Sequence, residues 1–184
     1  MNFNSRPRRN RSSESIRCML RETHLGPENL MMPLFVIAGE KKRVPVTSMP
    51  GILRFSIDEL LKECAELMDL GISQIALFPS LEENLKDSHA SESKNPRGLY
   101  PRAIAAVKEK FPEMTVMDPY SSDGHDGLVD QQTGEILNDE TLDILSEMAL
   151  NQARAGADII GPSDMMDGRV GFIRERLDSE GFKN

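Results

Sequence analysis

The chain has 184 residues, of which 39% are hydrophobic, and its formal net charge is −8. These values fit one soluble globular domain with a core of its own. No apolar run approaches the roughly 18 to 20 residues of a membrane span, and the first residues do not resemble a signal peptide. We therefore expect a cytoplasmic location and no membrane partner.

The first segment is basic although the chain as a whole is acidic. We expect residues 1–13 to form a basic N-terminal arm and residues 14–184 to form the folded domain. Phe3 is the only aromatic residue near the arginines, which disfavours nucleic acid as a partner. Arginine, serine and asparagine are also typical of transit peptides, so a plastid location stays open if the source is photosynthetic. The arginines are Arg6, Arg8, Arg9, Arg11, Arg17 and Arg21.

Short apolar runs alternate with longer segments of helical period along the rest of the chain. This alternation is typical of parallel strands joined by helices, and right-handed crossovers then bring the loops after the strands to one edge of the sheet. The predicted strands are residues 30–37, 74–78, 114–117 and 158–161. The predicted helices run from residue 56 to 71, 101 to 111, 138 or 139 to 156, and 167 to 181.

Two of these helices begin at residues that suit helix caps. Ser56 and Glu59 have the spacing of a capping box, in which each side chain satisfies a free backbone donor of the first turn. Asn138 or Asp139 is expected to cap the third helix.

The two cysteines, Cys18 and Cys64, lie far apart in the sequence and make no metal-type pair. We expect each of them to be a small, buried or half-buried apolar residue.

Two acid-rich loops follow the last two predicted strands. Residues 118–127 read Asp-Pro-Tyr-Ser-Ser-Asp-Gly-His-Asp-Gly, and residues 162–169 read Pro-Ser-Asp-Met-Met-Asp-Gly-Arg. Carboxylates placed between turn-forming residues at the ends of strands are typical of a functional site rather than of a plain connection.

These two loops resemble the porphobilinogen synthase family, also called 5-aminolevulinate dehydratase. The resemblance covers nearly the whole chain, because five further motifs follow in the family's order. It implies an α/β fold of the (β/α)₈ TIM-barrel, aldolase type. A complete barrel takes about 250 residues, so we expect about the first four β/α units here. The motifs are Arg-Pro-Arg-Arg at residues 6–9, Met-Pro-Leu-Phe-Val at 32–36, Ser-Met-Pro-Gly at 48–51, Ala-Leu-Phe-Pro at 76–79 and Asn-Pro-Arg-Gly-Leu at 95–99.

The resemblance also implies an activity. The family is a lyase of tetrapyrrole (haem and chlorophyll) synthesis that condenses two molecules of 5-aminolevulinate into porphobilinogen, through Schiff bases to two lysines and without an organic cofactor. Its members form homo-oligomers in which an N-terminal arm grips a neighbouring subunit. A reactive lysine must lose its proton near neutral pH, which requires burial or a nearby positive charge.

The family's two lysines belong to later strands that these 184 residues do not include, and the lysines present lie in polar surroundings. We therefore expect the isolated chain to be inactive. The alternative is a non-catalytic, truncated product that interacts with full-length subunits.

A metal site is implied at Asp118 and Asp126, where zinc-dependent relatives have cysteines. Carboxylates suit Mg²⁺ or another hard divalent cation better than Zn²⁺. The alternative is that both are turn residues that cap local backbone groups. His125 between them is a ligand, a base or simply exposed. The third strand is shorter than in the family, which removes the family's catalytic aspartate and the third metal position.

Ser163 and Asp164 are the candidate catalytic residues, since the family places its serine here in the active site. A hydroxyl and a carboxylate at a strand end can hold a substrate amine or relay a proton. The alternative is that they are N-caps of the following helix. Met165 and Met166 are expected to be packing residues.

Overall fold

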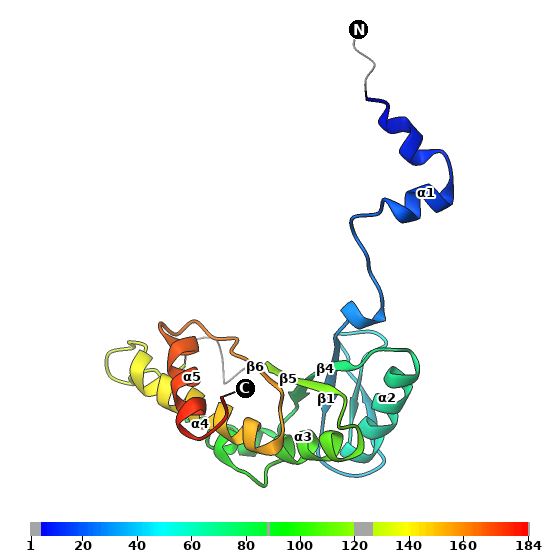
Figure 1. Ribbon diagram of the computed structural model, residues 1–184. Coiled ribbons are helices and arrows are strands. Elements are labelled where there is room, and N and C mark those ends of the chain that lie inside the picture. Colours follow the sequence, from blue (N-terminus) through cyan, green and yellow to red (C-terminus); the bar gives the residue numbers. More distant parts are fainter. Residues whose placement is uncertain (1–4, 88, 120–126, 184) are drawn as a thin grey trace.

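The computed structural model describes residues 5–87, 89–119 and 127–183, and its described strands form one sheet in the order β2-β3-β1-β4-β5-β6 (Figure 1). The four predicted strands are confirmed as β1 (Met32–Val36), β4 (Gln74–Pro79), β5 (Thr115–Pro119) and β6 (Ile159–Gly161). All three pairings among them are parallel. The predicted partial β/α barrel is therefore the observed architecture.

Two further strands were not predicted. They are β2 (Arg43–Pro45) and β3 (Leu53–Phe55), which form an antiparallel pair after β1. β3 also pairs in parallel with β1, but only at Phe35 and Val36 of β1. Strands of three residues are too short to show a period of two in the sequence.

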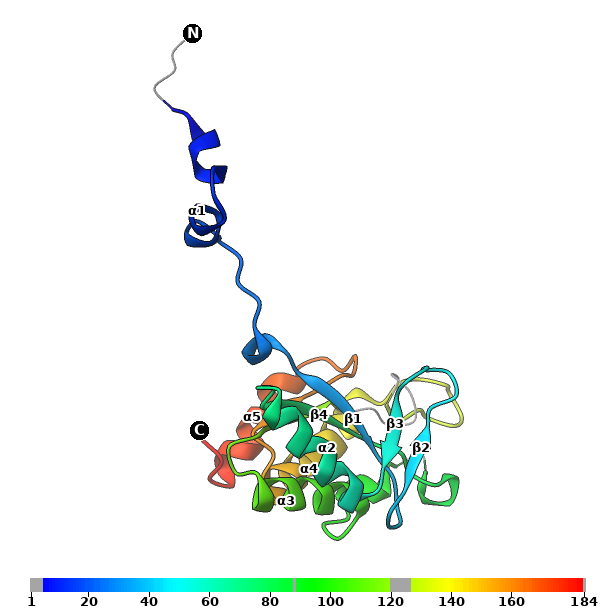
Figure 2. The same ribbon diagram turned by 90° about the vertical axis from the view of Figure 1, so that its right-hand side faces the viewer.

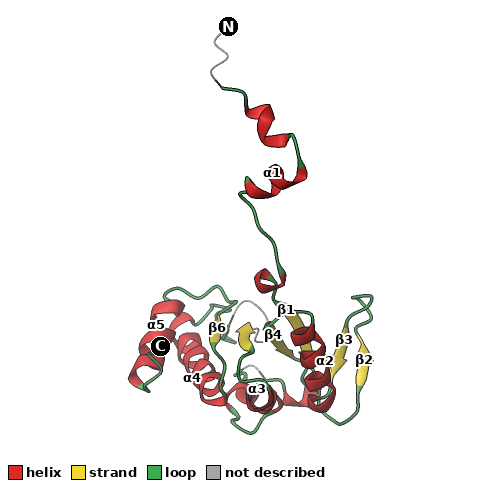
Figure 3. Cartoon of the chain, turned by 45° about the vertical axis from the view of Figure 1, so that its right-hand side comes forward, coloured by secondary structure: helices red, strands yellow, loops and turns green. Residues whose placement is uncertain are grey.

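The helices lie outside the sheet (Figure 3). α2 (Ile57–Asp69) and α3 (Leu99–Lys110) pack against β1 and β4 around one core, since apolar residues alternate with period two along the strands. The core side chains of this cluster are Leu34, Val36, Phe55, Leu60, Cys64, Leu67, Ile75, Leu77, Ala103, Ile104, Val107, Met114 and Val116. Short 3-10 helices at Glu83–Leu85 and Ser91–Lys94 lie between β4 and α3.

A second core lies between α4 (Asn138–Ala155) and α5 (Arg169–Ser179), which lie side by side at the end of the body away from α2 (Figure 1). Leu145 and Leu150 of α4 are almost completely buried there, and Ile173 and Leu177 of α5 face them. Ile160 of β6 packs against the same cluster. One face of the sheet thus packs against α2 and α3 at β1 and β4, and against α4 and α5 at β6.

Both predicted helix caps are wrong. The Ser56 hydroxyl accepts no hydrogen bond from a backbone N–H of α2; it accepts one from the Lys42 backbone N–H (2.9 Å) and donates one to the side-chain oxygen Oδ1 of Asp58 (2.6 Å). Asn138 Oδ1 accepts from the Asp167 N–H at 2.8 Å. These polar side chains connect elements far apart in the chain, an outcome that local capping rules do not include.

The N-terminal segment stands away from the body (Figure 2). It holds a 3-10 helix at Pro7–Arg11, α1 (Glu14–Met19) and a 3-10 helix at Pro27–Asn29, and no residue of these three is buried. Cys18 is exposed, contrary to the expectation, because α1 stands away from the body and contacts the short 3-10 helix Pro7–Arg11, whereas Cys64 of α2 is buried as expected. None of the helices in the described ranges combines the length and apolarity needed to cross a membrane.

Candidate functional site at the ends of β5 and β6

The two acid-rich loops leave the sheet side by side. β5 and β6 are parallel neighbours in which Asp118 pairs with Ile160 and Pro119 with Gly161. The carboxyl ends of parallel strands meet at one edge, which is the active-site edge in barrels of this type. The backbone therefore brings the start of residues 118–127 next to the start of residues 162–169.

The shortened third strand still forms. It was predicted at residues 114–117 and is observed at Thr115–Pro119, so it begins one residue later and ends two residues later than predicted. Met114 precedes it but is fully buried in the first core, as is Val116. The strand thus has five residues, as many as β1, and buries its core face.

Lys108 and Asp158 hold the beginning of this strand. The Lys108 ammonium donates to the backbone carbonyls of Met114 (2.9 Å) and Pro112 (3.0 Å), and it pairs with both carboxylate oxygens of Asp158 at 3.0 Å. Asp158 Oδ2 in turn accepts from the Val116 N–H at 2.9 Å. Lys108 of α3 thus connects this helix to the residues before β5 and β6.

Asp164 is the most constrained polar side chain of the site. Its side chain is only 6% exposed, and Oδ1 accepts from the Met166 N–H at 2.8 Å. Arg169 Nε lies 3.5 Å from the same oxygen, and Arg169 Nη1 donates to the Met166 carbonyl at 3.0 Å. The other oxygen, Oδ2, is buried and has no hydrogen-bond partner among the described residues. A buried acceptor without a partner costs about 1–3 kcal/mol.

Ser163, the residue before Asp164 in the sequence, is exposed. Neither residue caps the following helix, because α5 begins at Arg169 and its N-cap position is Gly168, a residue with φ of 78°. The capping alternative is therefore excluded for both residues. Met166 is 2% exposed and packs in the second core as predicted, whereas Met165 is 64% exposed and does not.

The proposed metal ligands lie outside what the structure describes. Asp118 has a described backbone position in β5, but its side chain is outside the described part, and so are His125 and Asp126 entirely. Among the described residues no three His, Cys, Asp or Glu side chains form a group that could hold a metal ion. The Asp118–Asp126 site accordingly stays a prediction.

The lysines are poor candidates for Schiff-base chemistry. Lys108 is half-buried and ion-paired with Asp158. The other seven lysines are exposed, and Lys62 and Lys86 among them lie beside Glu59 and Glu83. A reactive lysine is desolvated or lies beside another cation, and no lysine of the described chain is fully buried.

Sequence reasoning missed the contributions of Arg169 and Asn138. The sequence analysis gave Arg169 only as the last residue of its loop. Its position five residues after Asp164 could have indicated an ion pair between the two side chains within that loop. Asn138, the first residue of α4, holds the loop of residues 162–168 by accepting a hydrogen bond from the Asp167 N–H. That contact joins residues 29 positions apart, and no local pattern indicates it.

Comparison with known proteins agrees with this geometry. A sequence model of the family described as "Delta-aminolevulinic acid dehydratase" matches residues 4–184. The chain belongs to this family. The chloroplastic delta-aminolevulinic acid dehydratase 1 of Arabidopsis thaliana is 47% identical over 190 residues, covering 100% of this chain and 44% of that relative. The Bradyrhizobium diazoefficiens enzyme is 50% identical and covers 96% of this chain and 51% of its own length.

A solved dehydratase has the same fold. The Toxoplasma gondii ME49 enzyme, crystallised with its reaction product porphobilinogen, superposes with a TM-score of 0.90 at 49% identity. The match covers 98% of this chain and 52% of that one. The chain thus spans about half the length of the dehydratases it matches, and their TIM-barrel fold is the fold of which it forms a part.

Proposed function

We propose that this chain serves as the N-terminal half of a porphobilinogen synthase, a lyase of tetrapyrrole synthesis that condenses two molecules of 5-aminolevulinate. Family membership supports the reaction class. Since the relatives are about twice as long, the activity belongs to a complete scaffold to which this chain contributes one side of the substrate site.

The observation that carries the proposal is Asp164 Oδ2, a buried oxygen with no hydrogen-bond partner within residues 5–87, 89–119 and 127–183. Oδ1 accepts a hydrogen bond from the Met166 N–H and forms an ion pair with Arg169 Nε at 3.5 Å, whereas Oδ2 has no hydrogen-bond partner among the residues that the structure describes. The amino group of 5-aminolevulinate is a matching donor, and the exposed Ser163 hydroxyl beside it can donate or accept a second hydrogen bond. We propose that this pair binds and orients the substrate amine.

The isolated chain is proposed to be catalytically incompetent. Its exposed lysines and the ion-paired Lys108 are unsuited to forming Schiff bases near neutral pH. The alternative function, a non-catalytic chain that associates with full-length subunits, is supported by the same lysine environments and by the protruding N-terminal segment.

Members of this family depend on metal ions in general. We propose that Asp118 and Asp126 hold Mg²⁺ or another hard divalent cation, because both are carboxylates. Such a cation would supply a fixed positive charge near the substrate. We also propose a plastid or cytoplasmic location, as related plant and algal enzymes are described as chloroplastic and a bacterial one is not.

The test joins the two halves in one polypeptide. Residues 1–184 are fused to the part of the Toxoplasma gondii enzyme that this chain does not match, and the fusion is incubated with 5-aminolevulinate and borohydride, which reduces a Schiff base to a stable adduct. We expect an adduct on a lysine of the appended half. Asp164→Asn should lower the yield of adduct by about tenfold, the effect of about 1.4 kcal/mol of lost binding.

Ser179→Ala is the matched control for Ser163→Ala, because both hydroxyls are exposed and Ser179 lies at the end of α5, outside the site. The control should leave the yield unchanged. An adduct yield insensitive to both Asp164→Asn and Ser163→Ala would contradict the proposed role of this loop.

A further inference from the structure

β5 ends in a proline although other strands pair with it on both sides. The strand lies between β4 and β6 in the sheet, and Pro119 is its last residue. A proline has no backbone N–H and cannot donate a hydrogen bond to a neighbouring strand, so prolines are rare inside sheets. The direction in which the missing N–H would point decides which neighbour loses a hydrogen bond.

The missing donor faces β4. The Thr115 N–H donates to the Ser73 carbonyl, just before β4, at 2.9 Å. In a parallel pair every second N–H of a strand points to the same neighbour, so residues 117 and 119 follow as donors. Their acceptors are the carbonyls two and four residues after Ser73. The second of these acceptors is the Leu77 carbonyl, whose donor would be the N–H that Pro119 lacks.

The observed register agrees with this count. The β4–β5 ladder ends with the pair Ala76–Met117. β5 nevertheless continues on its other side, where Pro119 pairs with Gly161 of β6. The last two residues of β5 thus separate from β4 and follow β6, which brings the start of residues 118–127 beside the start of the second acid-rich loop.

Tyr100 supplies the hydrogen bond that Pro119 cannot. From the first turn of α3 its hydroxyl donates to the Leu77 carbonyl at 2.7 Å. Leu77 is fully buried, and a buried carbonyl without a donor is costly. The tyrosine ring is partly buried against the first core, which holds the hydroxyl at this carbonyl.

We propose that Tyr100 is a positioning residue of the candidate site. Its hydroxyl takes the place of the donor missing at Pro119, so the end of β5 leaves β4 without an unpaired carbonyl and stays beside β6. The inference rests on the proposed function, because Tyr100 acts on the substrate site through the backbone of residues 118–119. Pro119→Ala would restore the N–H, and the β4–β5 ladder would then extend by one pair in place of the tyrosine contact.

A double-mutant cycle in residues 1–184 tests this exchange of donors. Tyr100→Phe should lower the folded-to-unfolded ratio about tenfold in urea melts, because the Leu77 carbonyl loses its donor. In the Pro119→Ala background the same substitution should lower the ratio at most about twofold, since the N–H of residue 119 takes the carbonyl. The cycle also cancels the effect of the proline on the unfolded chain.

Ser146→Ala is the matched control for Tyr100→Phe. Ser146 is buried, and its hydroxyl donates to the Asp143 carbonyl at 2.9 Å within α4. Its effect on the folded-to-unfolded ratio should be the same with and without Pro119→Ala. If Tyr100→Phe also had the same effect in both backgrounds, the proposal would be overturned.

Positioning needs a readout other than stability. In the fusion with the Toxoplasma gondii half, we measure the 5-aminolevulinate concentration that gives half of the maximal adduct yield. This concentration should rise about tenfold both in Tyr100→Phe and in the double variant, because small displacements at a site reduce productive binding. The double variant should do so although its stability is restored, since the end of β5 is then drawn to β4.

Recovery of both stability and the half-maximal concentration in the double variant would make Tyr100 purely structural and overturn the proposal. A wild-type fusion that forms no adduct would instead reject the proposed function. The double-mutant cycle in the chain alone would still decide whether Tyr100 replaces the donor missing at Pro119, so the two failures are distinguishable.

Discussion

Cys64 and Cys18 differ sharply in their surroundings. Cys64 is completely buried between α2 and the sheet, and burial raises the pKa of its thiol to about 12. Cys18 is exposed on α1. Because the thiolate is the reactive form, we expect iodoacetamide at pH 8 to modify only Cys18 in the folded protein, whereas Cys64 reacts after unfolding in guanidinium chloride. Mass spectrometry that finds both thiols modified at equal rates would show that the first core opens readily.

The contact between Lys108 and Asp158 is expected to stabilise the shortened strand. Asp158→Asn removes the charge that holds Lys108 and weakens the acceptor for the Val116 N–H. We expect the free energy of unfolding to fall by about 1–2 kcal/mol, towards the low end for hydrogen bonds to charged groups because Lys108 and Asp158 are partly exposed.

Asp178→Asn is the matched control for this substitution. Asp178 pairs with Arg174 at 2.7 Å, but both side chains are about half exposed. A change of at most about 0.5 kcal/mol is therefore expected from urea melts. Equal losses for the two variants would mean that Lys108 does not fix the strand.

At the scale of elements, the β2–β3 pair is joined to α2 by charge. Arg43 of β2 lies 2.7 Å from Glu59 of α2, and Lys62 pairs with the same carboxylate. The hydrogen bonds from Lys62 and then Arg43 lower the pKa of Glu59 below its ordinary value of 4.5. A carboxyl group with a lowered pKa stabilises the fold above its ordinary pKa, and that contribution is lost as the pH falls through the lowered value.

We therefore expect the free energy of unfolding to decrease as the pH falls below 4.5, and Glu59→Gln to make this decrease shallower. Glu109→Gln on the exposed side of α3 removes the same charge and serves as the control. The measurement is a series of urea melts between pH 7 and pH 3. Identical pH profiles for the wild-type chain and Glu59→Gln would contradict the pairing.

The sequence predicts those helices and strands that bury one face or lie entirely within the core. β1, β4 and α2 have regular apolar patterns, and they were found within a few residues of their true bounds. β2 and β3 were not predicted, because strands of three residues are too short to show the alternation of apolar and polar residues. Ser56 and Asn138 have the right spacing for caps, yet each binds a distant backbone group, an arrangement that only the tertiary structure determines.

The candidate site was predictable to a similar extent. Ser163 and Asp164 were found because polar residues follow a buried strand. The partners that fix Asp164, by contrast, depend on where α5 begins. That helix starts at Arg169 rather than at residue 167, and Arg169 Nε lies 3.5 Å from Asp164 Oδ1.

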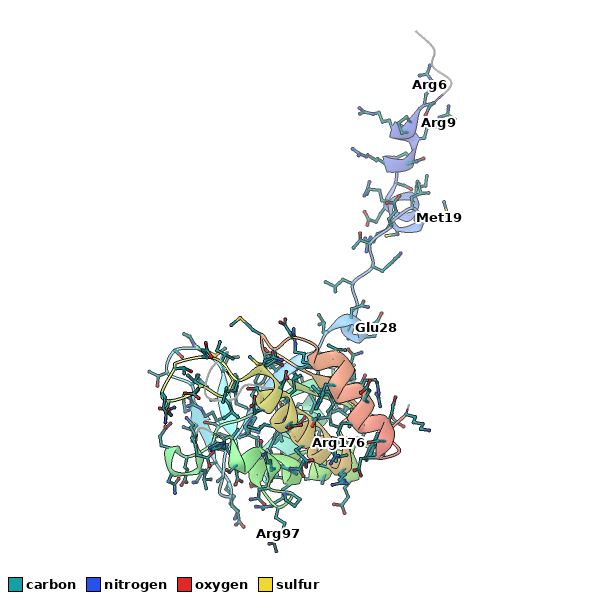
Figure 4. The ribbon with its side chains drawn as sticks, turned by 90° about the vertical axis from the view of Figure 1, so that its left-hand side faces the viewer. Arg6, Arg9, Met19, Glu28, Arg97 and Arg176 are labelled. Atoms are coloured by element: carbon teal, nitrogen blue, oxygen red, sulfur yellow. The ribbon has the colours of Figure 1, made fainter. Side chains whose placement is uncertain are left out.

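At the scale of the whole molecule, the N-terminal segment reaches far beyond the body, with Arg6, Arg9 and Met19 distant from Arg97 and Arg176 (Figure 4). Met19 and Leu25 are 76% and 79% exposed, so the segment offers apolar surface as well as positive charge. We predict that it binds a neighbouring subunit, since arginines form paired hydrogen bonds with carboxylates.

Deleting residues 1–12 should then reduce the size of the assemblies formed by this chain, or with a full-length relative, in sedimentation velocity. Arg97→Gln on the body removes a positive charge without touching the segment and is the control. An unchanged assembly size after the deletion would mean that the segment is a solvated tail.

Borohydride trapping on the purified chain tests most directly the claim that these 184 residues form one incomplete half of a dehydratase site. The chain is incubated with 5-aminolevulinate and borohydride, with and without Mg²⁺, and each lysine is examined by peptide mass spectrometry. Because Lys108 is ion-paired with Asp158 and the other lysines are exposed, we predict no specific adduct and no porphobilinogen. A stoichiometric adduct on a single lysine would contradict this account, because a complete Schiff-base site would then exist within this chain.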